Sequence, residues 1–243
     1  MKNKMLRNGV EMPEVGFGTW KAGETDGFAV LSEAIRAGYR HIDTASAYHT
    51  EEAVGRAVAA SGVDRSEFFI TTKAWKDQLG YDRTLAAFDA SCQALGMDYL
   101  DLYLIHWPRP DAACEEWKEL DRAGRVRAIG VSNFLPHHLE NLLEVCTVPP
   151  MVDQIEFHPG YVQWETVEFC RASQILVEAW SPLGRQRLAD DPLLAELAGK
   201  YGVSQAQICL RFALDCGVVP LPKSADAGRM RQNLALDFAL EAE

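Results

Sequence analysis

The stretch YLDLYLIHW (99–107) is mostly apolar and ends in polar and aromatic side chains. Apart from Asp101, leucine, tyrosine and isoleucine fill it as far as Ile105, and His106 and Trp107 follow directly. A strand that is apolar on both faces is typical of a parallel sheet with helices covering both sides. The stretch therefore predicts a buried strand of an α/β fold.

Seven other segments of the chain share this character, and helical patterns fill the gaps between them. These segments are VGFGTW (15–20), HIDTA (41–45), FFITTKAW (68–75), VRAIGVSNF (126–134), MVDQIEFH (151–158), ILVEAWS (175–181) and VVPLPKS (218–224). Eight β-then-α units predict one (β/α)8 TIM barrel that forms a single domain over residues 1–243. The longer gap before the last strand has room for an extra helix from Pro192 to Tyr201. Asn8-Gly9 at the centre of Met5 to Met12 predicts an N-terminal β-hairpin.

Composition narrows the class of protein and its partners. The 243 residues carry a net charge of −11, which argues against a nucleic acid or an anionic membrane as partner. No apolar run is long enough for a transmembrane helix, and no apolar segment follows the basic N-terminus as in a signal peptide. The six cysteines include no C-x-x-C pair, so we expect free thiols and a cytoplasmic location.

Polar residues recur at the carboxyl ends of the predicted strands. In a barrel these ends meet at one face, which is where active sites lie. Any one of these residues has a structural explanation, but the same placement on seven strands indicates a site. They are Asp43, Lys73, His106, Ser132 with Asn133, Gln154 with Glu156, Trp180 with Ser181, and Lys223 with Ser224.

Asp43, Tyr48, Lys73 and His106 together suit proton delivery to a carbonyl oxygen. The ordinary tyrosine pKa of about 10 is too high for efficient proton exchange near neutrality, and a nearby ammonium lowers it. Asp43 could hold Lys73 charged and aimed, and His106 could orient the carbonyl.

Two other kinds of site find little support. No G-x-S-x-G motif places a nucleophile beside a base, and no H-E-x-x-H motif or cysteine pair indicates a metal. We read His137 with His138 as a solvated helix start and His158 as structural. We therefore expect no metal site.

From about Leu6 to Asn233 the sequence resembles the aldo-keto reductase family. The order and spacing of the matching motifs are most similar to the bacterial branch that includes diketogluconate reductases. The motifs are GFGTW (16–20), HIDTASAYHTEEAVG (41–55), ITTKAW (70–75), DLYLIHWP (101–108), GRVRAIGVSNF (124–134), QIEFHP (154–159), EAWSPLG (178–184) and VPLPKS (219–224).

The resemblance implies roles for residues. It makes Tyr48 the general acid, Lys73 and Asp43 the pair that tunes it, and His106 the residue that orients the carbonyl. It also implies an NADPH site, and the cationic cluster of Lys223, Arg229 and Arg231 favours the 2′-phosphate of NADPH over NADH. The implied cofactor residues are Ser132, Asn133 and Gln154 at the carboxamide, Trp180 on the nicotinamide ring, Ser181, Leu183 and Gly184 in the same motif, and Lys223, Ser224, Arg229 and Asn233 at the adenosine phosphate.

The tryptophans after the strands have two interpretations, and two parts of the chain depart from the family pattern. Trp20, Trp75 and Trp107 follow barrel strands and either line a pocket for a small carbonyl substrate or belong to the core. Family members usually continue past the NLALDF segment, and the stretch from Trp117 to Gly124 is about one helical turn shorter than expected. The missing C-terminal tail predicts a more open pocket, and the shorter stretch predicts a shortened fourth helix. The resemblance suggests a monomer.

The sequence leaves three hypotheses for the function of the protein. The first is an NADPH-dependent reductase of small aldehydes and ketones. The second is the same barrel binding NADPH as a sensor or partner subunit with little or no turnover. The third is a phosphate-sugar isomerase or lyase, which would need a Gly-rich phosphate loop that SPLGRQR (181–187) and PKSADAGR (222–229) do not provide.

Overall fold

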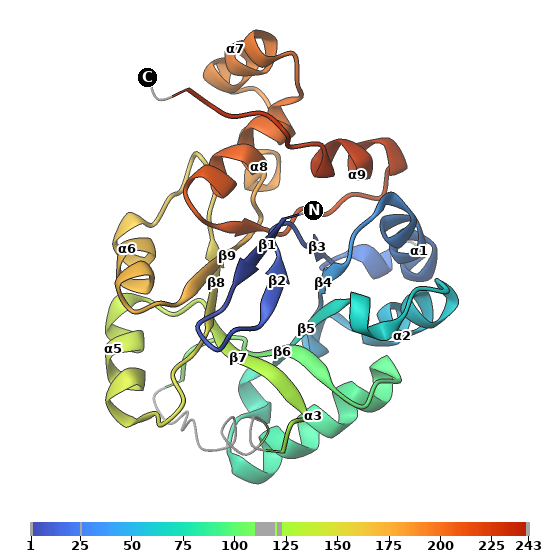
Figure 1. Ribbon diagram of the computed structural model, residues 1–243, viewed down its shortest axis with the longest axis vertical. Helices are drawn as coiled ribbons and strands as arrows, with labels where there is room; N and C mark the ends of the chain where they lie inside the picture. The colour runs from blue at the N-terminus through green and yellow to red at the C-terminus, as the bar shows by residue number, and fades with distance from the viewer. Residues whose placement is uncertain (1, 25, 110–119, 121–122, 242–243) are drawn as a thin grey trace.

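The computed structural model describes residues 2–24, 26–109, 120 and 123–241, and it shows a closed barrel of parallel strands (Figure 1). Each strand pairs with the next in sequence order, and each begins within two residues of its predicted start. The backbone N–H groups of Gly16 and Gly18 donate to the carbonyls of Pro220 and Pro222 at 3.0 and 3.1 Å, which joins the last strand to the first. The predicted (β/α)8 barrel is confirmed. Its strands are β3 (Phe17–Gly18), β4 (His41–Asp43), β5 (Phe69–Ala74), β6 (Leu100–Ile105), β7 (Val126–Ser132), β8 (Val152–Glu156), β9 (Leu176–Trp180) and β10 (Val219–Pro220).

Helices surround the barrel, and short 3-10 turns follow several strands (Figure 1). The predicted shortening between Trp117 and Gly124 lies almost wholly outside the described residues. The helices are α1 (Gly27–Ala37), α2 (Glu51–Ala60), α3 (Tyr81–Leu95), α5 (Pro136–Val145), α6 (Trp164–Ala172), α7 (Pro192–Tyr201), α8 (Gln205–Asp215) and α9 (Ala227–Leu234). The 3-10 turns are η1 (Ala22–Glu24), η2 (Ser46–Tyr48), η3 (Arg65–Glu67), η4 (Lys76–Gln78) and η5 (Gly184–Gln186).

Local sequence sets the helix boundaries. Asp26 accepts a hydrogen bond from the Ala29 N–H and so satisfies one of the free donors at the start of α1. Ser204 and Gln207 form the predicted capping box of α8. Pro136 is the first residue of α5, where its missing N–H costs nothing. The extra helix predicted from Pro192 to Tyr201 forms as α7.

The predicted hairpin also forms, at the opposite end of the barrel from the polar strand ends. Its strands β1 (Asn3–Met5) and β2 (Glu11–Pro13) pair antiparallel. The Asn8 side-chain amide donates to the backbone carbonyl of Arg127 at 2.8 Å, which ties the turn to the beginning of β7. The hairpin therefore covers the amino-terminal end of the barrel and leaves the carboxyl-terminal end open to ligands.

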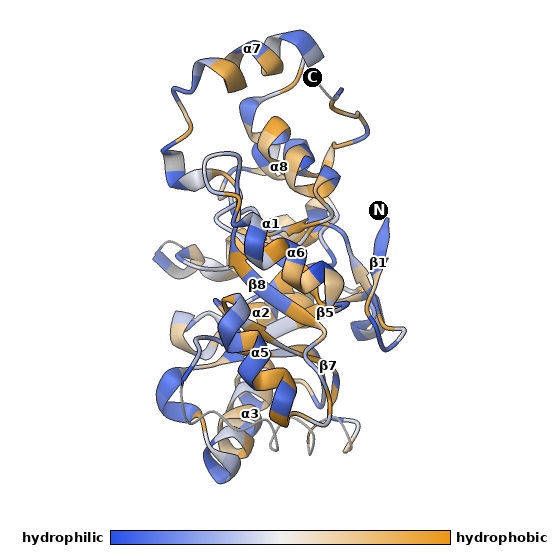
Figure 2. Cartoon of the chain, turned by 90° about the vertical axis from the view of Figure 1, so that its left-hand side faces the viewer, coloured by the Kyte–Doolittle hydropathy of each residue, from blue (hydrophilic) through white to orange (hydrophobic). Residues whose placement is uncertain are grey.

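Apolar side chains fill the space between strands and helices, and α7 stands out from the barrel at one end (Figure 2). Leu194 of α7 packs with Ile208 and Cys209 of α8 in a small separate core. On the other side of the molecule α2 and α3 approach so closely that a Cβ on Gly55 would lie 2.1 Å from the backbone oxygen of Leu95. This contact packs α2, which leads into β5, against α3, which leads into β6.

Candidate active site

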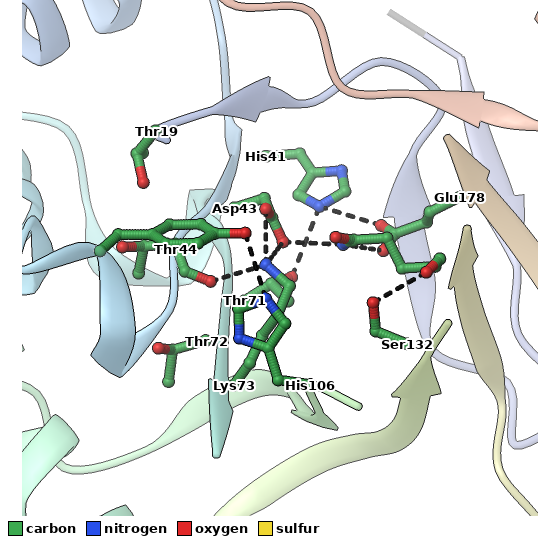
Figure 3. Close-up of polar contacts among 12 residues, drawn as sticks. Thr19, His41, Asp43, Thr44, Thr71, Thr72, Lys73, His106, Ser132 and Glu178 are labelled. Atoms are coloured by element: carbon green, nitrogen blue, oxygen red, sulfur yellow. Dashed lines mark hydrogen bonds and ion pairs between the residues drawn. The ribbon is translucent and has the colours of Figure 1, made fainter. Parts of the chain in front are cut away.

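The structure brings Asp43, Lys73 and His106 together at the carboxyl end of the barrel (Figure 3). Tyr48 contacts both Lys73 and His106 there. Asp43 is the last residue of β4, and Lys73 lies late in β5. Tyr48 ends η2, the turn that follows β4, and His106 comes directly after β6. Three neighbouring strands therefore place an ammonium, a carboxylate, a phenol and an imidazole within contact of one another.

Lys73 is fully buried and completely paired. Its ammonium donates to both carboxylate oxygens of Asp43, at 2.7 and 2.6 Å, and to the backbone oxygen of Thr44 at 2.8 Å. Burial is the largest single influence and opposes the charge, but the charge and hydrogen bonds of Asp43, together with smaller contributions from Tyr48 and Glu178, outweigh it, and the pKa of Lys73 lies above its usual value. Lys73 is therefore a fixed cation, aimed by Asp43.

Tyr48 lies between this cation and His106. Its hydroxyl is 3.4 Å from Nε2 of His106, and the Lys73 ammonium is 5.1 Å from the centre of its ring. We expected Lys73 to lower the phenol pKa. Burial dominates instead and raises the pKa of Tyr48, while the charges of Lys73 and Arg185 only reduce the rise. Tyr48 is thus a protonated phenol, the form that a proton donor needs.

His106 is neutral in this environment. Burial and then the charges of Lys73 and Lys76 lower its pKa to about 3. The edge of the Trp75 ring packs on it, with 4.9 Å between ring centres. A neutral imidazole beside a phenol can take part in a hydrogen bond to a carbonyl oxygen without adding a charge.

Two buried polar residues beneath these four, His41 and Glu178, were not predicted from the sequence, and the predicted Gln154 connects them to Asp43. Gln154 on β8 donates from Nε2 to Asp43 at 2.8 Å and to Glu178 on β9 at 3.0 Å. His41 on β4 lies 3.3 Å from the other oxygen of Glu178 (Figure 3). The period of two in a strand was the missed signal, because His41 lies two residues before Asp43 and Glu178 two before Trp180.

Glu178 is protonated. Burial lowers the pKa of His41 to about 3, and its Nδ1 lies 3.4 Å from the Pro13 carbonyl, so Nδ1 carries the proton of the neutral ring. Its Nε2 is then an acceptor that lies 3.3 Å from Oε1 of Glu178, and two buried acceptors this close favour a protonated carboxyl. Burial, followed by the charge of Asp43, raises the pKa of Glu178 to about 8. A neutral Glu178 carboxyl therefore lies beneath the ion pair of Lys73 with Asp43.

The predicted nicotinamide residues form a second group beside the first. Ser132 donates to the backbone oxygen of Gln154 at 2.8 Å, and the Asn133 amide donates to Ser132 Oγ and to the His106 backbone oxygen, both at 3.0 Å. The indole N–H of Trp180 donates to Asn133 Oδ1 at 2.9 Å. This network fixes the edge of the Trp180 ring next to the His106 segment.

Comparisons with known proteins agree with this geometry. The Aldo/keto reductase family profile matches residues 14–243. The chain belongs to the aldo-keto reductase family. A glyoxal reductase of Bacillus subtilis is 46% identical over 98% of this chain and 88% of its own length. A methylglyoxal reductase of Salmonella typhimurium is 43% identical, with 98% and 89% covered. The crystal structure of an aldo-keto reductase from Bombyx mori in complex with NADP has a TM-score of 0.90 at 38% identity, and the match covers 99% of this chain and 89% of that one.

The residues predicted for the adenosine end of a cofactor gather after β10. Ser224 Oγ accepts from the Asp226 N–H at 3.0 Å, and Asp226 caps α9 through the Arg229 N–H. Lys223 and Arg229 are exposed, and Asn233 is buried on α9. The guanidinium of Arg229 is held only weakly, with its Nε 3.9 Å from Asp226, and so it can turn to a phosphate.

The loop after β9 carries a cation across the mouth of the barrel. Ser181 and Gly184 both have positive φ, 49° and 63°, and the loop turns sharply there. Arg185 donates to Ser181 Oγ at 2.9 Å, and its guanidinium lies 5.0 Å from the ring centre of Trp180 and 4.9 Å from that of Trp20. The third predicted residue of this loop, Leu183, is partly buried against both cores.

The three predicted pocket tryptophans surround the same mouth. Trp20 and Trp107 are largely exposed at 45% and 37%, and Trp75 is half-buried against His106. Plain core residues would not be exposed to this degree, so their position favours the pocket interpretation.

The three histidines that the sequence analysis left outside the site contact neighbouring side chains. His158 is buried beside Glu156, with 3.3 Å between Nε2 and the carboxylate, and the His137 and His138 rings lie against each other at the start of α5. No cluster able to hold a metal ion is present among the described residues. Five cysteines are free thiols, and Cys114 lies outside the described residues. Within the described chain, no helix combines the length and the hydropathy needed to cross a membrane.

Proposed function

We propose that this protein reduces small aldehydes and ketones to alcohols with NADPH. The proposal depends mainly on one observation, the protonated Tyr48 hydroxyl held between the Lys73 ammonium and the neutral imidazole of His106. A carbonyl oxygen placed between Tyr48 and His106 would meet two hydrogen-bonding groups at once. The two reductases of 2-oxoaldehydes among the relatives make glyoxal and methylglyoxal the first compounds to try.

The side chains present fit an NADPH cofactor. Trp180 offers an aromatic face at the mouth, and both hydrogens of the Gln154 amide are taken by acidic side chains, so its oxygen is left as an acceptor. Such an acceptor suits the amide N–H of a nicotinamide carboxamide. Lys223 and Arg229 are exposed cations near the start of α9 and suit a 2′-phosphate.

Each residue has a defined task in the proposed reaction. NADPH, when bound, supplies a hydride to the carbonyl carbon. Tyr48 donates its phenolic proton to the carbonyl oxygen, and Lys73 stabilises the phenolate that remains. His106 holds the carbonyl oxygen in place. Solvent then returns a proton to Tyr48, so the overall reaction consumes one carbonyl compound, one NADPH and one proton.

The test is NADPH oxidation with methylglyoxal and a panel of simple aldehydes. Tyr48→Phe keeps the ring and removes the proton donor, so kcat should fall by at least about 100-fold. Tyr161→Phe is the matched control, because Tyr161 is 51% exposed, its ring lies against His158 rather than against any of the four catalytic candidates, and it should keep the full rate. Full activity in Tyr48→Phe would refute the assignment of the proton donor.

The same assay separates the sensor hypothesis from the reductase. A sensor or partner subunit would bind NADPH tightly and oxidise it with none of the carbonyl compounds. We also propose, from the family resemblance and the free thiols, that the protein is a cytoplasmic monomer. Size-exclusion chromatography with light scattering tests the monomer.

A further inference from the structure

Lys76 is a cation at the substrate side of the mouth that the proposed catalytic set does not use. It is the first residue of η4, directly after Trp75. Its ammonium lies 5.6 Å from the ring centre of Trp75 and 5.1 Å from that of Trp107. The Trp75 ring in turn packs on His106, so Lys76 is one aromatic ring away from the residue that would hold the carbonyl.

This cation differs from the other two that lie over tryptophans at the mouth. Lys21 is paired with Glu24 at 3.2 Å, and Arg185 is bonded to Ser181. Lys76 makes no ion pair within the described part of the chain, and the carboxylate of the adjacent Asp77 does not pair with it there. An exposed ammonium held over two indole rings is restricted in position while its charge stays available to a ligand.

The cofactor does not explain Lys76. The residues that fit NADPH lie after β7, β8, β9 and β10, whereas Lys76 and Trp107 follow β5 and β6. In strand order, β5 and β6 lie away from β9 and β10. The charge of Lys76 nevertheless reaches the catalytic candidates, because it contributes to the lowered pKa of His106.

We infer that Lys76, with Trp75 and Trp107, forms an anion subsite of the substrate pocket that favours aldehydes and ketones carrying a carboxylate. The two rings would take the carbon chain of the substrate, and the ammonium would pair with its carboxylate. An ammonium is a compact point charge and can pair with a carboxylate from many directions, so the subsite selects the charge of a substrate more than its shape. This inference rests on the proposed function and names a substrate class for it.

A pair of substrates that differ only in charge tests the inference. Succinic semialdehyde carries a carboxylate, and its methyl ester has the same carbon chain and the same aldehyde without the charge. We expect wild-type protein to have the higher kcat/KM for the acid. In Lys76→Gln the ratio of acid to ester should fall about fivefold, as expected for loss of one partly exposed charge pair, and the loss should appear in KM.

Two further variants control for structural effects. Lys76→Arg keeps the charge and should retain most of the preference for the acid. Lys21→Gln removes another cation that lies over a pocket tryptophan but is already paired, and it should leave the ratio unchanged. Added salt should lower the ratio in wild type and have little effect in Lys76→Gln.

The outcomes are distinguishable. Equal kcat/KM values for acid and ester in wild type, or the same ratio in wild type and Lys76→Gln, would overturn the anion subsite while leaving the reductase in place. Absence of NADPH oxidation with both compounds and with the aldehyde panel would overturn the proposed function and this inference with it.

Discussion

Gln154 donates a hydrogen bond to Asp43 across the barrel, with 2.8 Å between Nε2 and Oδ2. Gln154 is on β8 and Asp43 on β4, strands that lie on opposite sides of the closed sheet. Through the same nitrogen Gln154 also contacts Glu178 at 3.0 Å. Asp43, which positions the Lys73 ammonium, is therefore itself held by a residue from the opposite side of the barrel. That residue, Gln154, is also a candidate for cofactor binding.

The protonated state of Glu178 predicts how stability depends on pH. With its pKa raised from 4.5 to about 8, the folded protein binds a proton that the unfolded chain releases between these values. Its contribution to stability is therefore complete below about pH 4.5 and is lost as pH rises through about 8. Glu178→Gln keeps the hydrogen-bonding pattern and cannot titrate. The free energy of unfolding of wild type minus that of the variant should fall with rising pH, by up to about 1.4 kcal/mol per pH unit, and level off above about pH 8.

Urea denaturation of both proteins between about pH 5 and pH 9 measures this difference. Two curves that stay parallel over the whole range would show that Glu178 is ionised in the folded protein.

Replacement of Lys73 should lower the free energy of unfolding and kcat for two different reasons. Lys73→Met leaves Asp43 buried without its counter-charge, so we expect a loss of about 3–5 kcal/mol in the free energy of unfolding. Asp43→Asn combined with Lys73→Met removes both charges and should recover most of this loss. Both variants lack the cation that stabilises a Tyr48 phenolate, and kcat should fall in both. Chemical denaturation and NADPH oxidation are the measurements, and a stable, active Lys73→Met protein would contradict the role of the pair.

The selectivity for NADPH should depend on Arg229. Removal of its guanidinium in Arg229→Ala takes away a charge-assisted partner of the 2′-phosphate, and KM for NADPH should rise about tenfold while KM for NADH stays nearly constant. Arg36→Ala is the control, since Arg36 is a similarly exposed arginine on α1 that pairs with Glu33. An equal rise in KM for both cofactors would place Arg229 elsewhere than at the 2′-phosphate.

The contact between α2 and α3 should tolerate no side chain at Gly55. The Cβ of Gly55→Ala would meet the Leu95 backbone oxygen at 2.1 Å, so the helices must separate, and we expect a loss of about 1–3 kcal/mol. Gly199→Ala in α7 meets no atom within 4 Å and should raise stability by up to about 1 kcal/mol. Thermal denaturation compares the two variants. An unchanged melting temperature in Gly55→Ala would show that the two helices can separate at little cost in free energy.

Much of the architecture could be predicted because it depends on local patterns. Strand positions follow from short apolar runs, and the α8 boundary follows from Ser204 and Gln207, which are neighbours in the chain. The placement of Asp43, Lys73 and His106 at one face follows from their positions at strand ends once the strands are parallel.

The protonation states could not be predicted in this way. We expected Lys73 to lower the pKa of Tyr48, yet burial outweighs that charge and raises it. His41 and Glu178 read as ordinary strand residues, and only their contact across the barrel shows that one carboxyl is neutral. A pKa depends on desolvation and on charges brought together from distant segments, and neither quantity is written in local sequence.

The sequence alone determined the (β/α)8 barrel, its family and the set of polar residues at its mouth, because periodicity and motif order are properties of neighbouring residues. Only the tertiary structure decided which of these residues touch, that Tyr48, His106 and Glu178 are uncharged, and that Lys76 lies over Trp75 and Trp107 beside the catalytic candidates. The physical reason is that closing the sheet joins β4 to β8 and β9 across its interior, where water is excluded and each charge acts at short range.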